Sequence, residues 1–131
     1  MNLLNQFLSL FSSPAASDSG VRRVAPREAA QLVRQKKAVL VDVREPAEWA
    51  GGVAQKAVLL SFNDLTGARL QWKPFLNQVG DREIILYCHS GSRSGVAARI
   101  LAAEGFKTAN AGTLRAWQRA GLPVCAPRGM R

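Results

Sequence analysis

The chain has 131 residues, of which 47% are hydrophobic, a length and composition typical of one globular domain with one core. Its net charge is +9, but the basic residues are scattered and no zinc-finger or aromatic–basic motif is present, so we expect a small anionic ligand and no nucleic-acid binding. Two cysteines without a Cys-x-x-Cys pair, and a single histidine, exclude a disulfide framework and predict no metal site.

Residues 1–20 differ from the rest of the chain because they contain no Lys or Arg. Apolar residues recur there at spacings of three and four, which predicts a short amphipathic helix followed by a Ser/Pro/Ala-rich linker. The apolar part is too short for a bilayer span of about 20 residues, and the missing positive charge disfavours a signal peptide. We expect a cytoplasmic protein whose first segment docks on the domain, a partner or a membrane surface. Export or membrane association through this segment is the alternative.

Strands and helices alternate from Val21 onward. Predicted strands cover residues 21–25, 38–43, 58–61, 83–88 and 108–110. Predicted helices begin at Pro26, follow the turn at 44–46, cover most of 65–79 with interruptions at Gly67 and Pro74, and span 94–105 and 114–121. This alternation, with nearly continuous apolar strands, predicts an α/β fold with a parallel sheet covered on both faces. Ligands bind such sheets at the carboxyl ends of the strands, where Cys88 and Asp42 lie.

The loop CHSGSRS, residues 88–94, joins the most apolar strand to the clearest helix. Free N–H groups at a helix start form an anion cradle, and Gly91 allows those groups to converge. Serine hydroxyls add donors, and Ser94 is a candidate N-cap. The helix start and the permanent cation of Arg93 both favour the thiolate form of Cys88, which is the nucleophilic form. The pattern therefore favours a catalytic cysteine over a buried, inert one.

Four segments of the chain resemble the rhodanese family of sulfurtransferases. They are VDVREPAEW (41–49), IILYCHSGSRS (84–94), SGVAARILAAEGF (94–106) and NAGTLRAWQRAGLPV (110–124). The resemblance implies one rhodanese domain, residues 21–125, between the N-terminal segment 1–20 and a basic tail, 126–131. It also implies a rhodanese-like fold with a five-stranded, mostly parallel sheet and helices on both faces.

The resemblance further implies the chemistry of the loop. Cys88 would accept a sulfane sulfur as a persulfide, while Arg93 and the loop N–H groups hold the anionic donor. The other substrate-binding candidates are His89, Ser90, Gly91, Ser92 and Ser94. The implied enzyme is of the thiosulfate sulfurtransferase type, with thiosulfate or a persulfide as donor and a thiol, cyanide or a protein as acceptor. It needs no metal or organic cofactor.

Two other functions stay open. One is a sulfur-relay or binding module that acts with a protein partner, which a docking N-terminal segment favours. The other is a phosphatase-like or arsenate-reductase-like enzyme. Four residues separate Cys88 from Arg93, whereas those enzymes have five in this fold, so sulfur transfer is favoured.

The chain departs from the family at two places. The usual Gly-His-Ile reads Gly52-Val53-Ala54, and we expect the missing histidine to loosen that turn. The usual Gly-Gly before the last helix reads Ala111-Gly112, which we expect to alter the pocket wall beside Cys88.

Asp42 and Arg44 are candidates for supporting the site. A structural ion pair with Glu45 or Glu48, or structural hydrogen bonds, is the interpretation that we favour for them. His89 follows the nucleophile, where it either contacts substrate or faces solvent.

Cys125 is either a resolving thiol for a Cys88 persulfide or a spare thiol, and the spare thiol is favoured. We expect the tryptophans to be core or pocket-wall aromatics and not a binding box; they are Trp49, Trp72 and Trp117.

Overall fold

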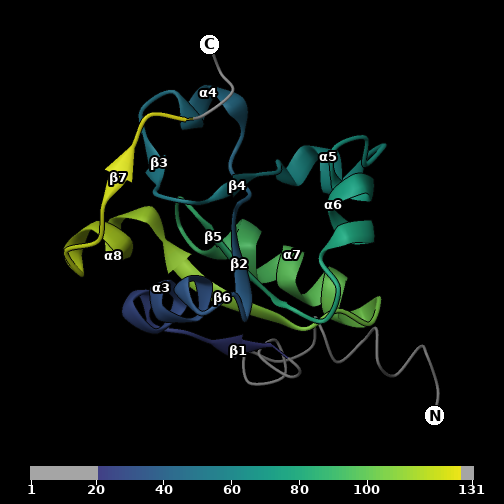
Figure 1. Ribbon diagram of the computed structural model, residues 1–131. Coiled ribbons are helices and arrows are strands. Elements are labelled where there is room, and N and C mark those ends of the chain that lie inside the picture. Colours follow the sequence, from purple (N-terminus) through teal and green to yellow (C-terminus); the bar gives the residue numbers. More distant parts are fainter. Residues whose placement is uncertain (1–20, 128–131) are drawn as a thin grey trace.

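A computed structural model describes residues 21–127 (Figure 1). The amphipathic helix and linker predicted for residues 1–20, and most of the predicted basic tail, lie outside the described residues. The strands are β1 (Arg22–Arg23), β2 (Ala38–Asp42), β3 (Val53–Ala54), β4 (Val58–Leu59), β5 (Glu83–Cys88), β6 (Thr108–Thr113) and β7 (Val124–Cys125). The helices are α3 (Pro26–Arg34), α4 (Pro46–Trp49), α5 (Phe62–Thr66), α6 (Trp72–Gln78), α7 (Ser92–Ala103) and α8 (Leu114–Arg119). Within the described range, none of these helices is long and apolar enough to cross a membrane.

The main sheet has five strands in the order β1-β6-β5-β2-β4, and each neighbouring pair is parallel. This arrangement confirms the predicted α/β class and the five-stranded sheet. The antiparallel pair β3–β7 was not predicted. Each of its strands has two residues, which is too short to show an alternating pattern in the sequence.

The two faces of the sheet are covered by different helices (Figure 1). Along β5, Ile84, Leu86 and Cys88 join one buried cluster, which includes residues of α5, α6 and α7. Ile85 and Tyr87 join a second cluster, with residues of α3 and α8. Successive side chains of a strand point to opposite faces, so the alternation places Cys88 on the α7 side.

The prediction for residues 65–79 was right at Gly67 and wrong at Pro74. Gly67 ends α5, but Pro74 lies inside the first turn of α6. Proline is tolerated there because the first N–H groups of a helix have no partner within that helix. Asp64 supplies partners for the N–H groups nearby, at 2.8 Å from Leu70, 2.9 Å from Gln71 and 3.1 Å from Trp72.

Candidate active site

Cys88 lies at the carboxyl end of β5, the central strand of the sheet. After β2 the chain continues outward to β4, whereas after β5 it continues to β6 on the other side, so the strand order reverses between β2 and β5. Ligands of parallel α/β sheets bind at such a reversal, outside the carboxyl ends of the strands. The loops that follow β2 and β5 therefore frame the candidate site.

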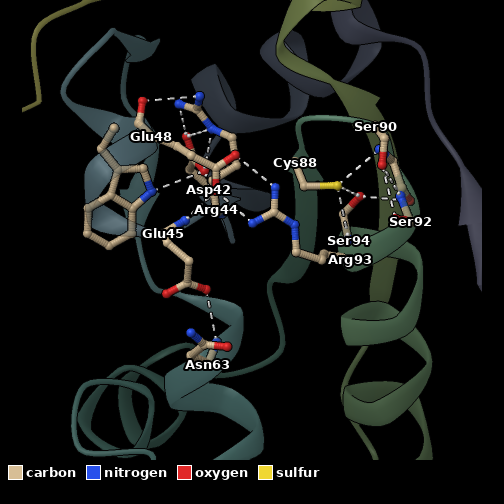
Figure 2. A network of polar contacts seen from close by, with 12 residues as sticks. Asp42, Arg44, Glu45, Glu48, Asn63, Cys88, Ser90, Ser92, Arg93 and Ser94 are labelled. Carbon is tan, nitrogen blue, oxygen red and sulfur yellow. Dashed lines mark hydrogen bonds and ion pairs between the residues drawn. The ribbon is translucent and has the colours of Figure 1, made fainter.

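Two backbone N–H groups converge on the Cys88 sulfur (Figure 2). The Gly91 N–H lies 3.0 Å from Sγ and the Ser94 N–H lies 3.4 Å from it. The Ser94 hydroxyl oxygen lies 3.4 Å from the same atom. The side chain of Cys88 is fully buried, so these donors act where water screens little. The loop thus forms a small cradle that is suited to negative charge on sulfur.

Ser94 does not cap α7, which corrects the sequence prediction. The N-cap is Gly91, with a left-handed φ of 92°, and Ser94 is buried in the first turn of the helix. The Ser94 hydroxyl reaches Asn110 Oδ1, at 2.8 Å, and the Gly91 carbonyl, at 3.2 Å. A glycine was expected to let the N–H groups converge, and its left-handed backbone turns the loop tightly enough for the Gly91 N–H to reach Sγ.

Asn110 on β6 is a residue that sequence reasoning missed. Its Nδ2 donates to the Gly91 carbonyl at 3.2 Å, and its Oδ1 also accepts the Gly112 N–H at 2.9 Å. The register shifts beside it, because Leu86 pairs with Asn110 whereas Tyr87 pairs with Gly112. Asparagine is uncommon within strands, so its position in a predicted strand was the available signal.

The remaining polar residues of the loop face outward. His89 and Ser90 are exposed, and the Ser90 and Ser92 hydroxyls lie 3.0 Å apart. Ser90 and Ser92 line a pocket of about 640 Å³ on this side, together with Ala111 and Gly112. The Ala111-Gly112 departure from the family pattern thus lies in a pocket wall next to the loop.

Arg93 forms an ion pair with Glu48 across the site (Figure 2). The two terminal nitrogens of the guanidinium donate to the two carboxylate oxygens, at 2.7 Å and 2.9 Å. These hydrogen bonds with Arg93 lower the pKa of Glu48 to about 2, and the same bonds raise the pKa of Arg93, to which the nearby Cys88 adds. From the sequence we expected Arg93 to bind the substrate, and Glu48 was not identified as its partner.

Asp42 and Arg44 make structural hydrogen bonds, as in the favoured interpretation, but their ion pair joins them to each other and not to the side chain of Glu45 or Glu48. Asp42 is fully buried, and its carboxylate accepts Arg44 Nη2 at 2.8 Å, Trp49 Nε1 at 3.2 Å and the Tyr87 hydroxyl. Burial, followed by the charge of Asp42, raises the pKa of Tyr87. Through Arg44 and Tyr87, this network holds the backbone of residues 48–54, which follow β2.

The turn that lacks the family's histidine is anchored by this network. Arg44 Nη2 donates to the Gly52 carbonyl at 2.7 Å, and the Tyr87 hydroxyl accepts the Ala54 N–H at 2.9 Å. Val53 and Ala54 also pair with β7. These contacts hold the turn although the histidine is absent.

The second cysteine, Cys125, lies on β7 opposite Val53, is partly exposed, and is a free thiol like Cys88. It borders a different hollow, formed with β3 and β4. The tryptophans expected in the core or a pocket wall are all buried, with exposed fractions of 8% or less: Trp49, Trp72 and Trp117.

A protein-family comparison matches residues 25–120 to the model of the Rhodanese-like domain. The chain belongs to this family. The rhodanese-like domain is 37% identical over 101 residues to a sulfurtransferase of Allochromatium vinosum, a match that covers 76% of this chain and 89% of the relative. It is 36% identical to an uncharacterized protein of Synechocystis over 77% of this chain, but it spans 54% of that relative.

Solved structures show the same fold. A rhodanese-related protein of Thermoplasma volcanium has a TM-score of 0.67 at 23% identity, covering 81% of this chain and 99% of that one. The polysulfide-sulfur transferase homodimer of Wolinella succinogenes has a TM-score of 0.66 at 22% identity, covering 100% and 98%. A Rhodopseudomonas palustris protein of unknown function, described as a possible tyrosine phosphatase, has a TM-score of 0.69 at 25% identity, covering 82% and 87%.

Proposed function

We propose that this rhodanese-like domain moves sulfane sulfur from thiosulfate or a persulfide donor to a thiophilic acceptor through a persulfide on Cys88. Family membership and similarity to a sulfurtransferase support sulfur transfer as the general class of reaction. The observation that carries the role of Cys88 is the convergence of the Gly91 and Ser94 N–H groups on its sulfur. These donors favour a negatively charged sulfur at the start of a helix.

The proposed reaction has two steps. The Cys88 thiolate attacks the outer sulfur of the donor, so that a new S–S bond forms at Sγ while the S–S bond of the donor breaks. Sulfite, or the thiolate of a persulfide donor, leaves with the electron pair. The acceptor then attacks the outer sulfur, and Cys88 leaves as thiolate. No external oxidant or reductant is consumed, because each step exchanges one bond to sulfur for another.

The same N–H groups assist both steps. Negative charge lies on Sγ before the donor is attacked, and it returns to Sγ when the acceptor removes the sulfur. The N–H donors are already in place in both steps, so the protein does not need to reorganise as the charge develops. The short spacing between Cys88 and Arg93 supports sulfur over the tetrahedral oxyanion of a phosphatase, which takes a wider loop.

Replacement of the nucleophile tests this function. We expect Cys88→Ser to lower sulfur transfer from thiosulfate to cyanide by at least about a thousandfold, because a hydroxyl lacks the reactivity of a thiolate. Cys125→Ser, the matched control, retains the wild-type rate. Sulfur transfer that survives in Cys88→Ser, or aryl-phosphate hydrolysis without sulfur transfer in the wild type, contradicts the proposal.

A further inference from the structure

Glu48 is held in place beside the candidate site by its own helix. Its Oε1 accepts the Glu45 N–H at 3.0 Å as part of a capping box at the start of α4. Its carbonyl accepts Arg44 Nη1 at 3.4 Å, which ties α4 to the buried Asp42 network. The carboxylate is therefore fixed before any ligand arrives.

This carboxylate occupies both terminal nitrogens of Arg93. Figure 2 shows the Arg93 side chain between the Glu48 carboxylate and the Cys88 sulfur. A donor that uses these nitrogens must compete with a bidentate, charge-assisted partner, which is the strongest type of arginine hydrogen bond. Its low pKa keeps Glu48 ionised at neutral pH.

The charges of Arg93 and Glu48 cancel at the mouth of the cradle. When Cys88 is a thiolate, the group formed by the three side chains is negative. A divalent donor such as thiosulfate is then repelled by the thiolate, because the Glu48 carboxylate, which is 34% exposed, cancels the attraction that Arg93 would otherwise exert. The persulfide of an uncharged thiol carries at most one negative charge and is repelled less.

We propose that Glu48 is a specificity-determining residue that disfavours thiosulfate and favours a persulfide carried by a thiol as the sulfur donor. The inference rests on the proposed sulfur transfer at Cys88 and names the donor class for that site. Glu48 acts through its charge and through its hold on Arg93, not by contact with the reacting sulfur atoms.

The test compares two donors, thiosulfate and the persulfide of N-acetylcysteine amide, by kcat/KM with one acceptor. We expect Glu48→Gln to raise the thiosulfate-to-persulfide ratio by about tenfold, the effect of one partly screened charge on a divalent anion. Glu48→Asp keeps the charge and retains a ratio close to that of the wild type. Glu104→Gln is the matched control, because Glu104 makes an equally bidentate pair with Arg69, at 2.8 Å and 2.9 Å, away from Cys88.

Two results would contradict the role of Glu48, and a third would contradict the proposed sulfur transfer itself. A Glu48→Gln protein that loses activity equally with both donors shows that Glu48 only positions Arg93, and an unchanged ratio shows that its charge does not select; either result overturns the inference. A wild-type protein that takes sulfur from neither donor overturns the proposed function, and the inference with it. Thermal melts confirm that each variant is folded.

Discussion

At the scale of single residues, the buried carboxylate of Asp42 is the shared acceptor of the hydrogen bonds that support the candidate site. Arg44, Trp49 and Tyr87 all donate to it, and all four side chains are nearly inaccessible to solvent. Removal of one member of a buried ion pair leaves the other charge without compensation, which costs more than the loss of a neutral hydrogen bond. Asp42 and Arg44 thus hold the backbone that presents Glu48.

Replacement of Asp42 tests this role. We expect Asp42→Asn to lower the free energy of unfolding by about 3–5 kcal/mol, since the Arg44 charge is left buried and unpaired. Tyr87→Phe, which removes one hydroxyl from the same network, should cost about 1.5–3 kcal/mol. Urea denaturation at neutral pH measures both. An Asp42→Asn protein no less stable than Tyr87→Phe would show that the ion pair matters little.

At the scale of elements, the junction between β5 and α7 forms the cradle. Gly91 begins the helix in a left-handed conformation, and Asn110 of β6 fixes its carbonyl from the next strand. A Cβ added at Gly91 would approach the Gly112 Cα at 3.7 Å, which is ordinary contact distance. An alanine there meets backbone strain and no steric clash, so its effect reports on loop geometry.

A pair of glycine substitutions separates loop geometry from stability. Gly91→Ala and Gly105→Ala both place a side chain at positive φ, 92° and 101°, and each should cost roughly 1–2 kcal/mol of stability. We expect only Gly91→Ala to slow sulfur transfer, by at least about tenfold, because its N–H moves away from Cys88 Sγ. Equal activity of the two variants in a transfer assay would show that the Gly91 N–H does not assist the reaction.

At the scale of the whole molecule, the Arg93–Glu48 pair joins the loops that follow β2 and β5, across the reversal in strand order. The hydrogen bonds of Arg93 lower the pKa of Glu48 from 4.5 to about 2. The unfolded chain therefore takes up a proton on Glu48 at a higher pH than the folded protein does. The stability that the pair contributes is present above pH 4.5 and is lost as the pH falls toward 2.

This linkage predicts an acid-dependent difference in stability. We expect Glu48→Gln to lower the free energy of unfolding by no more than about 1 kcal/mol at neutral pH, because solvent screens a partly exposed pair. The difference should vanish as the pH falls through the range between the unfolded and folded pKa values, and it should shrink at high salt. A difference that stays constant with pH in denaturation curves would mean that the variant acts by another route.

The sequence predicted most of the sheet because its long strands are strongly apolar, as in β2 and β5, and its best helix shows a clear C-terminal stop. The cysteine loop was also visible, since its residues are contiguous. The site residues that the sequence did not reveal are those whose roles depend on contacts between distant segments. Glu48 lies 45 positions before Arg93, and Asn110 lies 16 positions after Ser94. Such pairings follow from the strand order, which local patterns do not specify.

We propose above all that Cys88 carries the transferred sulfur atom. Mass spectrometry of the donor-treated full chain, after alkylation and proteolysis, locates an added sulfur directly. We predict one additional sulfur on the peptide that contains Cys88, its loss on treatment with cyanide, and none in Cys88→Ser. A sulfur atom found on Cys125, or none on either cysteine after treatment with both donors, would contradict it.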